Sequence, residues 1–245
     1  MTPEPVWDAR LRLFCFPYAG GGASAFFSWQ RSLPRGVEVR GVQPPGREGR
    51  VRERPIAEWG PFLDGLMAEL VPRLDVPFAF FGHSLGATVA FEVARRLRAM
   101  GGPQPLHLFA SGRTAPHLPM EDPPVHALPE PEFVAELRRL GGTPEEVLGN
   151  ADLMSILLPL LRADFGLSET YEHTPGDPLD LPITGYGGVR DERVEPERVS
   201  AWRQHTRAGF REVMFPGGHF FLHEDRQSLL ADLSNELDGM LVRVR

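Results

Sequence analysis

Short apolar segments and longer amphipathic segments alternate along most of the chain. Apolar or alternating runs predict strands at 11–16, 37–42, 78–81, 106–111, 183–186 and 212–215. Apolar side chains at helical spacing predict helices at 56–73, 88–100, 196–207 and 227–242. This alternation favours the α/β class, with a mainly parallel sheet that carries helices on both faces.

One region interrupts the alternation. Between residues 116 and 182 there is no convincing strand, but helical segments interrupted by proline and glycine occur at 131–140, 144–148 and 152–163. Helices inserted between two strands of such a sheet predict a lid over a site at the sheet edge. The alternative is a group of peripheral helices that does not cover the site. With 245 residues, the chain fits one domain, 1–245, with this insertion at about 116–182.

A glycine-flanked serine lies where a predicted strand gives way to a predicted helix. In Gly82-His83-Ser84-Leu85-Gly86, the two glycines leave room for the strand and the helix to cross. Ser84 is thereby lifted to the tip of the turn, as in a G-x-S-x-G nucleophile elbow. The backbone N–H of Leu85, at the helix N-terminus, is then placed to face a developing oxyanion.

A serine hydroxyl needs a base, and the base needs an acid that fixes its tautomer. His219 is the predicted base because it follows Pro216-Gly217-Gly218 directly after a strand; His223, one helical turn further on, is its rival. Asp191 is the predicted acid because it follows the strand at 183–186 and precedes His219, and the adjacent Glu192 is the alternative. Two further carboxylates fit the acid position less well: Asp164 and Asp180.

The second oxyanion donor is expected in the loop after the first strand. That loop is Pro17-Tyr18-Ala19-Gly20-Gly21-Gly22. We predict the backbone N–H of Ala19 as the donor, with the N–H of Tyr18 or of Gly20 as alternatives.

Charge and composition narrow the class of protein. The net charge of −7 argues against a general nucleic-acid binder, and all 26 basic residues are arginine. The single cysteine, Cys15, lies in an apolar strand, so neither a disulfide framework nor a thiolate metal site is expected. No apolar run is long enough to span a membrane, and the first residues lack a signal-peptide pattern. We therefore expect a cytoplasmic protein without membrane attachment, metal or cofactor.

Six segments resemble the type II thioesterases, the free-standing editing enzymes of polyketide and nonribosomal peptide assembly lines. They are FPYAGGGASAF (16–26), PPGREGR (44–50), FFGHSLGATVAFEVARRL (80–97), LPLLRADF (158–165), YGGVRDERV (186–194) and FPGGHFFL (215–222). The medium-chain thioesterase of animal fatty acid synthesis is similarly close. The resemblance implies an α/β-hydrolase fold, and we expect a monomer. It also implies hydrolysis by Ser84, Asp191 and His219 of acyl groups carried on the phosphopantetheine arm of a carrier protein. Glu192 departs from the family, which often has proline after the aspartate.

Two groups of residues acquire a role from this resemblance. Apolar side chains of the insertion either line an acyl chamber or pack the lid against the body: Leu157, Leu158, Leu160, Leu161 and Phe165. A basic cluster either meets an acidic carrier protein or forms a solvated loop: Arg47, Arg50, Arg52 and Arg54.

Other classes of function fit less well. Gly20 to Ala25 satisfies the dinucleotide pattern G-x-G-x-x-A, but Glu38 falls in mid-strand, where it is poorly placed to bind a ribose. His219 and His223 have the spacing of two zinc ligands, but no third ligand is evident. A carboxylesterase or lipase that cleaves oxygen esters needs the same triad, so it stays the alternative function.

Overall fold

Six parallel strands form one sheet at the centre of the computed structural model, which describes residues 6 and 8–244. Their order across the sheet is β2-β1-β3-β4-β5-β6, and all five strand pairings are parallel. The strands are β1 (Leu11–Phe16), β2 (Val37–Gly41), β3 (Phe78–His83), β4 (Leu108–Ser111), β5 (Ile183–Gly188) and β6 (Phe210–Phe215). Each lies where the sequence predicts a strand, with ends that differ by two residues or fewer.

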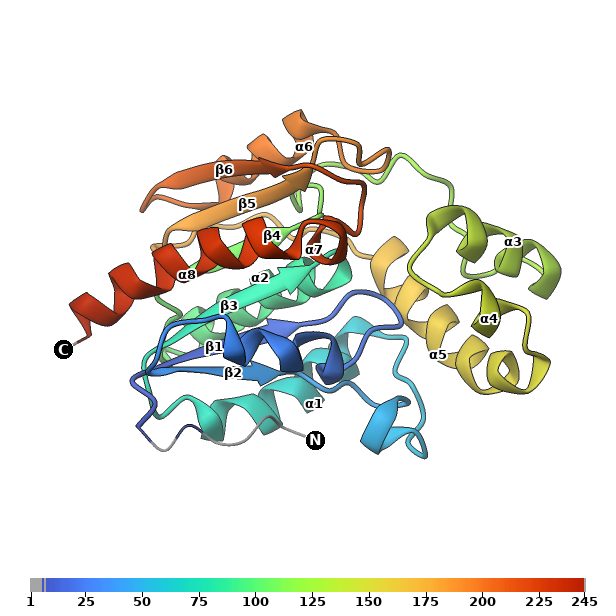
Figure 1. Ribbon diagram of the computed structural model, residues 1–245, viewed down its shortest axis with the longest axis horizontal. Helices are drawn as coiled ribbons and strands as arrows, with labels where there is room; N and C mark the ends of the chain where they lie inside the picture. Colours follow the sequence, from blue (N-terminus) through green and yellow to red (C-terminus); the bar gives the residue numbers. More distant parts are fainter. Residues whose placement is uncertain (1–5, 7, 245) are drawn as a thin grey trace.

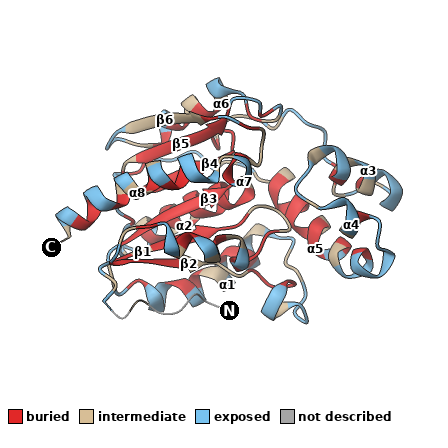
Figure 2. Cartoon of the chain, viewed as in Figure 1, coloured by how far each residue is buried: buried red, intermediate tan, exposed pale blue. Residues whose placement is uncertain are grey.

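The period-two alternation of the strands divides the core between the two faces of the sheet. In β1, Leu11, Leu13 and Cys15 pack on one face, whereas Phe14 and Phe16 pack on the other. Both sets are buried, as Figure 2 shows for most of the sheet. A strand that is apolar on both faces requires a layer of helices on each.

Helices supply those two layers. On one face lie α1 (Trp59–Leu70), α2 (Leu85–Ala99) and η4 (Ala201–His205). The short η3 (Val71–Arg73) continues α1, and α6 (Pro196–Ser200) precedes η4. On the other face lie η1 (Ala23–Arg31), α7 (Phe221–Glu224) and α8 (Arg226–Arg243). Figure 1 shows α8 in front of the sheet and α2 behind it. The predicted mainly parallel sheet with helices on both faces is confirmed.

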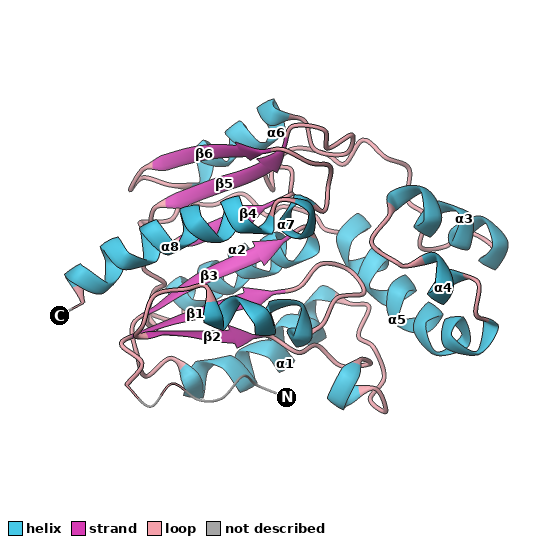
Figure 3. Ribbon diagram, in the orientation of Figure 1, coloured by secondary structure: helices cyan, strands magenta, loops and turns pink. Residues whose placement is uncertain are grey.

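Three helices are inserted between β4 and β5. They are α3 (Glu130–Leu140), α4 (Glu145–Leu148) and α5 (Ala151–Glu169). In Figure 3 the strand arrows point towards this group, so the insertion lies beyond the carboxyl ends of the strands. It has an apolar cluster of its own, formed by Val125, Phe133, Leu137, Leu148, Met154, Leu158, Leu161 and Phe165.

The local differences from the predicted elements are small. The helix predicted at 56–73 begins at Trp59, and α2 already begins at Leu85. The sequence did not predict η1 or the short η2 (Glu48–Arg50), both of which are 3₁₀ helices. Neither has a side-chain N-cap, so the sequence carries no start signal for them. Within the described residues, no helix is long and apolar enough to cross a membrane.

Candidate active site

The turn between β3 and α2 holds Ser84 in an unusual backbone conformation. Its φ is 53° and its ψ is −119°, a region that costs a non-glycine residue about 1–3 kcal/mol. A Cβ on Gly82 would lie 2.2 Å from the carbonyl oxygen of Gly86, and one on Gly86 would lie 2.1 Å from that of Phe16. Both glycines are therefore required by close backbone contacts, as expected for a nucleophile elbow.

Asp191 and His219 form a hydrogen-bonded pair beside this turn. His219 Nδ1 lies 2.8 Å from Asp191 Oδ2, and the exposed fractions of the two side chains are 8% and 0%. Asp191 follows β5 and His219 follows β6, which are neighbouring strands. The other oxygen of Asp191 accepts the backbone N–H groups of Arg193 (2.9 Å) and Val194 (3.3 Å). These bonds hold the carboxylate in one orientation, whereas Glu192 is exposed to solvent.

Ser84 and His219 line the same two cavities. The Nε2 atom of His219 is buried and has no hydrogen-bond partner within the part of the chain that the structure describes. The Ser84 hydroxyl is thus not bonded to Nε2 here; such catalytic bonds are often long without substrate and shorten in the complex. The arrangement brings together all three residues that the sequence selects.

His83 packs against the imidazole of His219 as a neutral ring. Its Nδ1 lies 2.9 Å from the Ser111 hydroxyl, and its ring centroid lies 5.3 Å from that of His219. Complete burial holds the pKa of His83 well below its ordinary value. Because His83 carries no charge near neutral pH, it does not oppose a positive charge that develops on His219.

The loop after β1 lies beside Ser84, and its backbone N–H groups differ in whether they already have a hydrogen-bond acceptor. Ala19 lines one of the two cavities together with Ser84 and His219. The N–H of Gly20 donates to Asp164 Oδ2 at 2.7 Å, so this alternative donor already has an acceptor. Leu85 is the first residue of α2, where no acceptor within the helix is available to its N–H. The amides of Leu85 and Ala19 therefore stay the predicted oxyanion donors, and the predicted alternative at Gly20 is already bonded.

His223 lies in a different environment from His219. Its Nε2 lies 3.1 Å from the hydroxyl of Tyr18, and its partner is therefore a phenol and not a carboxylate. Among the described residues, no three histidine, cysteine, aspartate or glutamate side chains are grouped so that they could hold a metal ion. His223 thus contacts Tyr18, which directly precedes Ala19 in the loop after β1.

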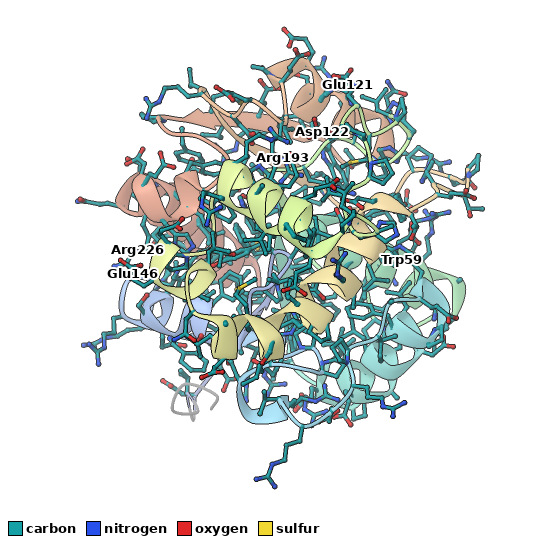
Figure 4. The ribbon with its side chains drawn as sticks, turned by 90° about the vertical axis from the view of Figure 1, so that its right-hand side faces the viewer. Trp59, Glu121, Asp122, Glu146, Arg193 and Arg226 are labelled. Atoms are coloured by element: carbon teal, nitrogen blue, oxygen red, sulfur yellow. The ribbon has the colours of Figure 1, made fainter. Side chains whose placement is uncertain are left out.

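Two cavities of different character meet at Ser84, Arg193 and His219. The first lies under the insertion and has a volume of about 30 Å³; Thr143, Arg193 and His219 line it together with the apolar side chains of Leu137, Leu140, Leu161, Phe165 and Phe220. The second, of about 50 Å³, is lined by Arg113, Glu121, Asp122, Glu192 and Arg198. Figure 4 shows Arg193 next to Asp122, and their charged atoms are 3.7 Å apart. The cavity under the insertion thus presents more apolar side chains, and the second cavity presents more charged ones.

Arg47 does not lie on the surface with the other arginines of the predicted basic cluster, so both roles considered for it are wrong. Arg47 is buried, with 6% of its side chain exposed, and is paired with Asp164. A buried guanidinium has no access to a partner protein. Arg50 is partly exposed and paired with Glu53, whereas Arg52 and Arg54 are exposed.

The apolar residues of the insertion divide between the two expected roles. Leu161 and Phe165 line the apolar cavity, but both also belong to the core of the insertion. Leu157 and Leu158 pack in that core, and Leu160 is buried without lining the cavity.

Glu38, which the dinucleotide pattern would assign to a ribose, is buried on β2. It is paired with Arg12 at 2.8 Å, so it takes no part in this site.

Arg193 and the buried Arg47–Asp164 pair were missed by the sequence analysis. Arg193 lies two residues after the acid, so its place beside the site could have been inferred from the position of Asp191. The ion pair joins residues separated by 117 positions, and nothing in either local pattern points to the other.

Comparison with known proteins gives a consistent result. A family model described as "Thioesterase domain" matches residues 11–237. The gramicidin S biosynthesis protein GrsT of Aneurinibacillus migulanus is 45% identical over 229 residues, which cover 94% of this chain and 90% of that protein. Among solved structures, the RedJ thioesterase of the prodiginine pathway in Streptomyces coelicolor has a TM-score of 0.88 and 43% identity, covering 96% of this chain and 88% of its own. The type II thioesterase BorB of the borrelidin cluster has a TM-score of 0.85 and 38% identity, covering 97% of this chain and 95% of its own.

Proposed function

On the premise that this chain belongs to the thioesterase family, we propose that it releases acyl groups from the phosphopantetheine arm of acyl or peptidyl carrier proteins. Its role would be to edit stalled polyketide or nonribosomal peptide assembly lines. Relatives named for gramicidin S, prodiginine and borrelidin biosynthesis support this context. In this proposal the enzyme acts as a monomer in the cytoplasm, and its protein partner is the carrier.

Hydrolysis proceeds in two steps through an acyl-enzyme. His219 Nε2 accepts the Ser84 proton as the oxygen attacks the thioester carbonyl, and Asp191 stabilises the imidazolium. The amides of Leu85 and Ala19 hold the oxyanion. The pantetheine thiol leaves with the proton from His219, and an ester remains on Ser84. His219 then takes a proton from water, whose oxygen attacks the ester, and returns that proton to Ser84 as the acid is released.

The observation that carries the proposal is the 2.8 Å contact between His219 Nδ1 and Asp191 Oδ2. This pair lies beside Ser84, and the chain belongs to a family of thioesterases. The apolar cavity under α3 and α5 is the proposed place of the acyl chain. Its volume of about 30 Å³ is small for an acyl chain. A wider space of about 500 Å³ shares Leu140, His219 and Phe220 with it. We propose that the insertion acts as a lid, shifting where it covers the site to admit the acyl group.

An esterase of the same fold would use the same three residues, so the test compares leaving groups. Wild-type enzyme is assayed on acyl-pantetheine thioesters and on oxygen esters with the same acyl chain, and then on an acylated carrier protein. We expect kcat/KM to be higher for the thioesters and highest for the carrier-bound acyl group. A strong preference for the oxygen esters would overturn the substrate assignment and favour the carboxylesterase alternative.

A further inference from the structure

A buried ion pair connects the insertion to the loop that carries the proposed oxyanion donor. Arg47 donates two hydrogen bonds to Asp164 of α5, from Nη1 to Oδ2 at 2.6 Å and from Nη2 to Oδ1 at 2.8 Å. The exposed fractions of the two side chains are 6% and 3%. Such bidentate geometry constrains both partners in direction as well as in distance.

The same two side chains also hold the loop itself. Asp164 Oδ2 accepts the N–H of Gly20 at 2.7 Å, and Arg47 Nη1 donates to the carbonyl of Gly21 at 2.9 Å. The Gly20 N–H and the Gly21 carbonyl, just after Ala19, are thus both bonded to the ion pair. The loop contains three consecutive glycines, Gly20 to Gly22, which alone would permit many conformations.

The carboxyl-terminal part of α5, next to this contact, is attached to the main body. The indole N–H of Trp59, on α1, donates to the carbonyl of Leu167 at 2.8 Å, and Leu167 belongs to the core of the main body. One turn before Asp164, Leu161 packs so closely on the loop that a Cβ on Gly20 would lie 2.7 Å from its Cδ2. Gly20 has a φ of +79°, which a larger residue would rarely adopt.

On the other side of Ala19, aromatic contacts fix Tyr18. Its ring packs edge-on against His83 and Phe220, with centroids 5.9 and 5.1 Å away. Ala19 is therefore held between an aromatic cluster and the Arg47–Asp164 pair. Removing the ion pair would free one side of this short loop while leaving Ser84, Asp191 and His219 in place.

We propose that Arg47 and Asp164 are positioning residues for the oxyanion hole: they orient the Ala19 amide through Gly20 and Gly21 and couple it to α5. The inference rests on the proposed function, because it takes Ala19 as the oxyanion donor. An amide that is misdirected binds the ground-state carbonyl almost as before but stabilises the oxyanion less. The pair should consequently affect kcat much more than KM.

The test measures kcat and KM for the Asp164→Ala variant and for the double variant Arg47→Met/Asp164→Leu. The single change leaves Arg47 buried without a partner, which destabilises the fold, whereas the double change removes both charges. We expect kcat to fall about 10- to 100-fold in both variants, less than the ~10²–10³ for loss of a donor, and KM to change less than about threefold. Binding of a trifluoromethyl ketone analogue of the substrate, which forms an oxyanion on Ser84, should weaken by the same factor as kcat/KM.

Glu169 provides the matched control on the same helix. It accepts the N–H groups of Val125 and His126, both at 3.0 Å, and does not contact the loop. Glu169→Gln should lower thermal stability but leave kcat within about threefold of wild type. The inference is overturned if the double variant folds and keeps the wild-type kcat and ketone affinity, or if Glu169→Gln lowers kcat equally.

This inference and the proposed function fail on different results. If wild-type enzyme leaves thioesters intact but cleaves oxygen esters, the proposed substrate is wrong, and the same variants are compared on the oxygen esters. The oxyanion forms in both reactions, so the expected fall in kcat applies to either. A wild type without activity on any ester would overturn both claims.

Discussion

Among single residues, two carboxylates that are adjacent in sequence lie in different environments beside Ser84. Asp191 is fully buried and bonded to His219, whereas its neighbour Glu192 is exposed. The sequence alone could not separate them decisively, because both follow β5 and both precede His219. The difference arises from the turn after β5, where the backbone N–H groups of Arg193 and Val194 point at Asp191.

This difference leads to a paired prediction. Asp191→Asn removes the negative charge that stabilises the imidazolium and fixes the His219 tautomer, so we expect kcat to fall about 10⁴-fold. Glu192→Gln changes the same chemical group one position away and should leave kcat within about threefold. The measurement is the steady-state kcat of each variant relative to wild type. Equal losses of activity, or a larger loss in Glu192→Gln, would show that the acid is wrongly assigned.

Residues near the site that interact over long sequence distances were harder to predict than the elbow. Gly82, Ser84 and Gly86 form a local pattern whose geometry follows from the crossing of one strand and one helix. Arg47, in contrast, stands in an arginine-rich loop that is typical of solvent exposure. Only its contact with Asp164 on α5 explains why it is buried.

At the scale of elements, strands were predicted more accurately than helix ends. The bounds of β1 coincide with the prediction because five of its six residues are apolar, and Arg10 and Pro17 flank this run. Helix α5 extends to Glu169, six residues beyond the predicted end at 163, because its carboxyl-terminal half packs on the body as well as on the insertion. A helix that touches two cores has no single apolar stripe, so its periodicity is weak.

Three helices, α3 to α5, lie between β4 and β5, where the sequence predicts a helical insertion. The sequence could not show which of its apolar residues face the site. The structure assigns Leu161 and Phe165 to the cavity that contains Ser84. That assignment follows from how the insertion sits over the sheet, which no local pattern encodes.

At the scale of the whole molecule, buried histidines make stability depend on pH. His107 is buried on the α8 side of the sheet, where its Nε2 lies 2.8 Å from the Thr184 hydroxyl. Burial, with a smaller effect of Arg211 and Arg243, lowers its pKa from 6.5 to about 3. Burial also lowers the pKa of His205 to about 4.

A pKa that is lower in the folded state means that the unfolded chain binds more protons at acidic pH. The free energy of unfolding is therefore greatest above pH 6.5 and falls as the pH decreases towards the folded-state pKa. For His107 alone we expect a loss of about 2 kcal/mol between pH 7 and pH 5. Urea unfolding at the two pH values should show a smaller difference in His107→Gln than in wild type. The same pH dependence in both proteins would contradict this account.

The assembled molecule brings Ser84, Asp191 and His219 from the ends of three strands to one edge of the sheet, and the central claim is that Ser84 is the nucleophile there. Its most direct test is the kcat of Ser84→Ala on an acyl-pantetheine thioester, with Ser228→Ala on the exposed side of α8 as the control. We predict a loss of at least about 10⁴-fold for Ser84→Ala and wild-type turnover for Ser228→Ala. Turnover by Ser84→Ala within tenfold of wild type would contradict the account.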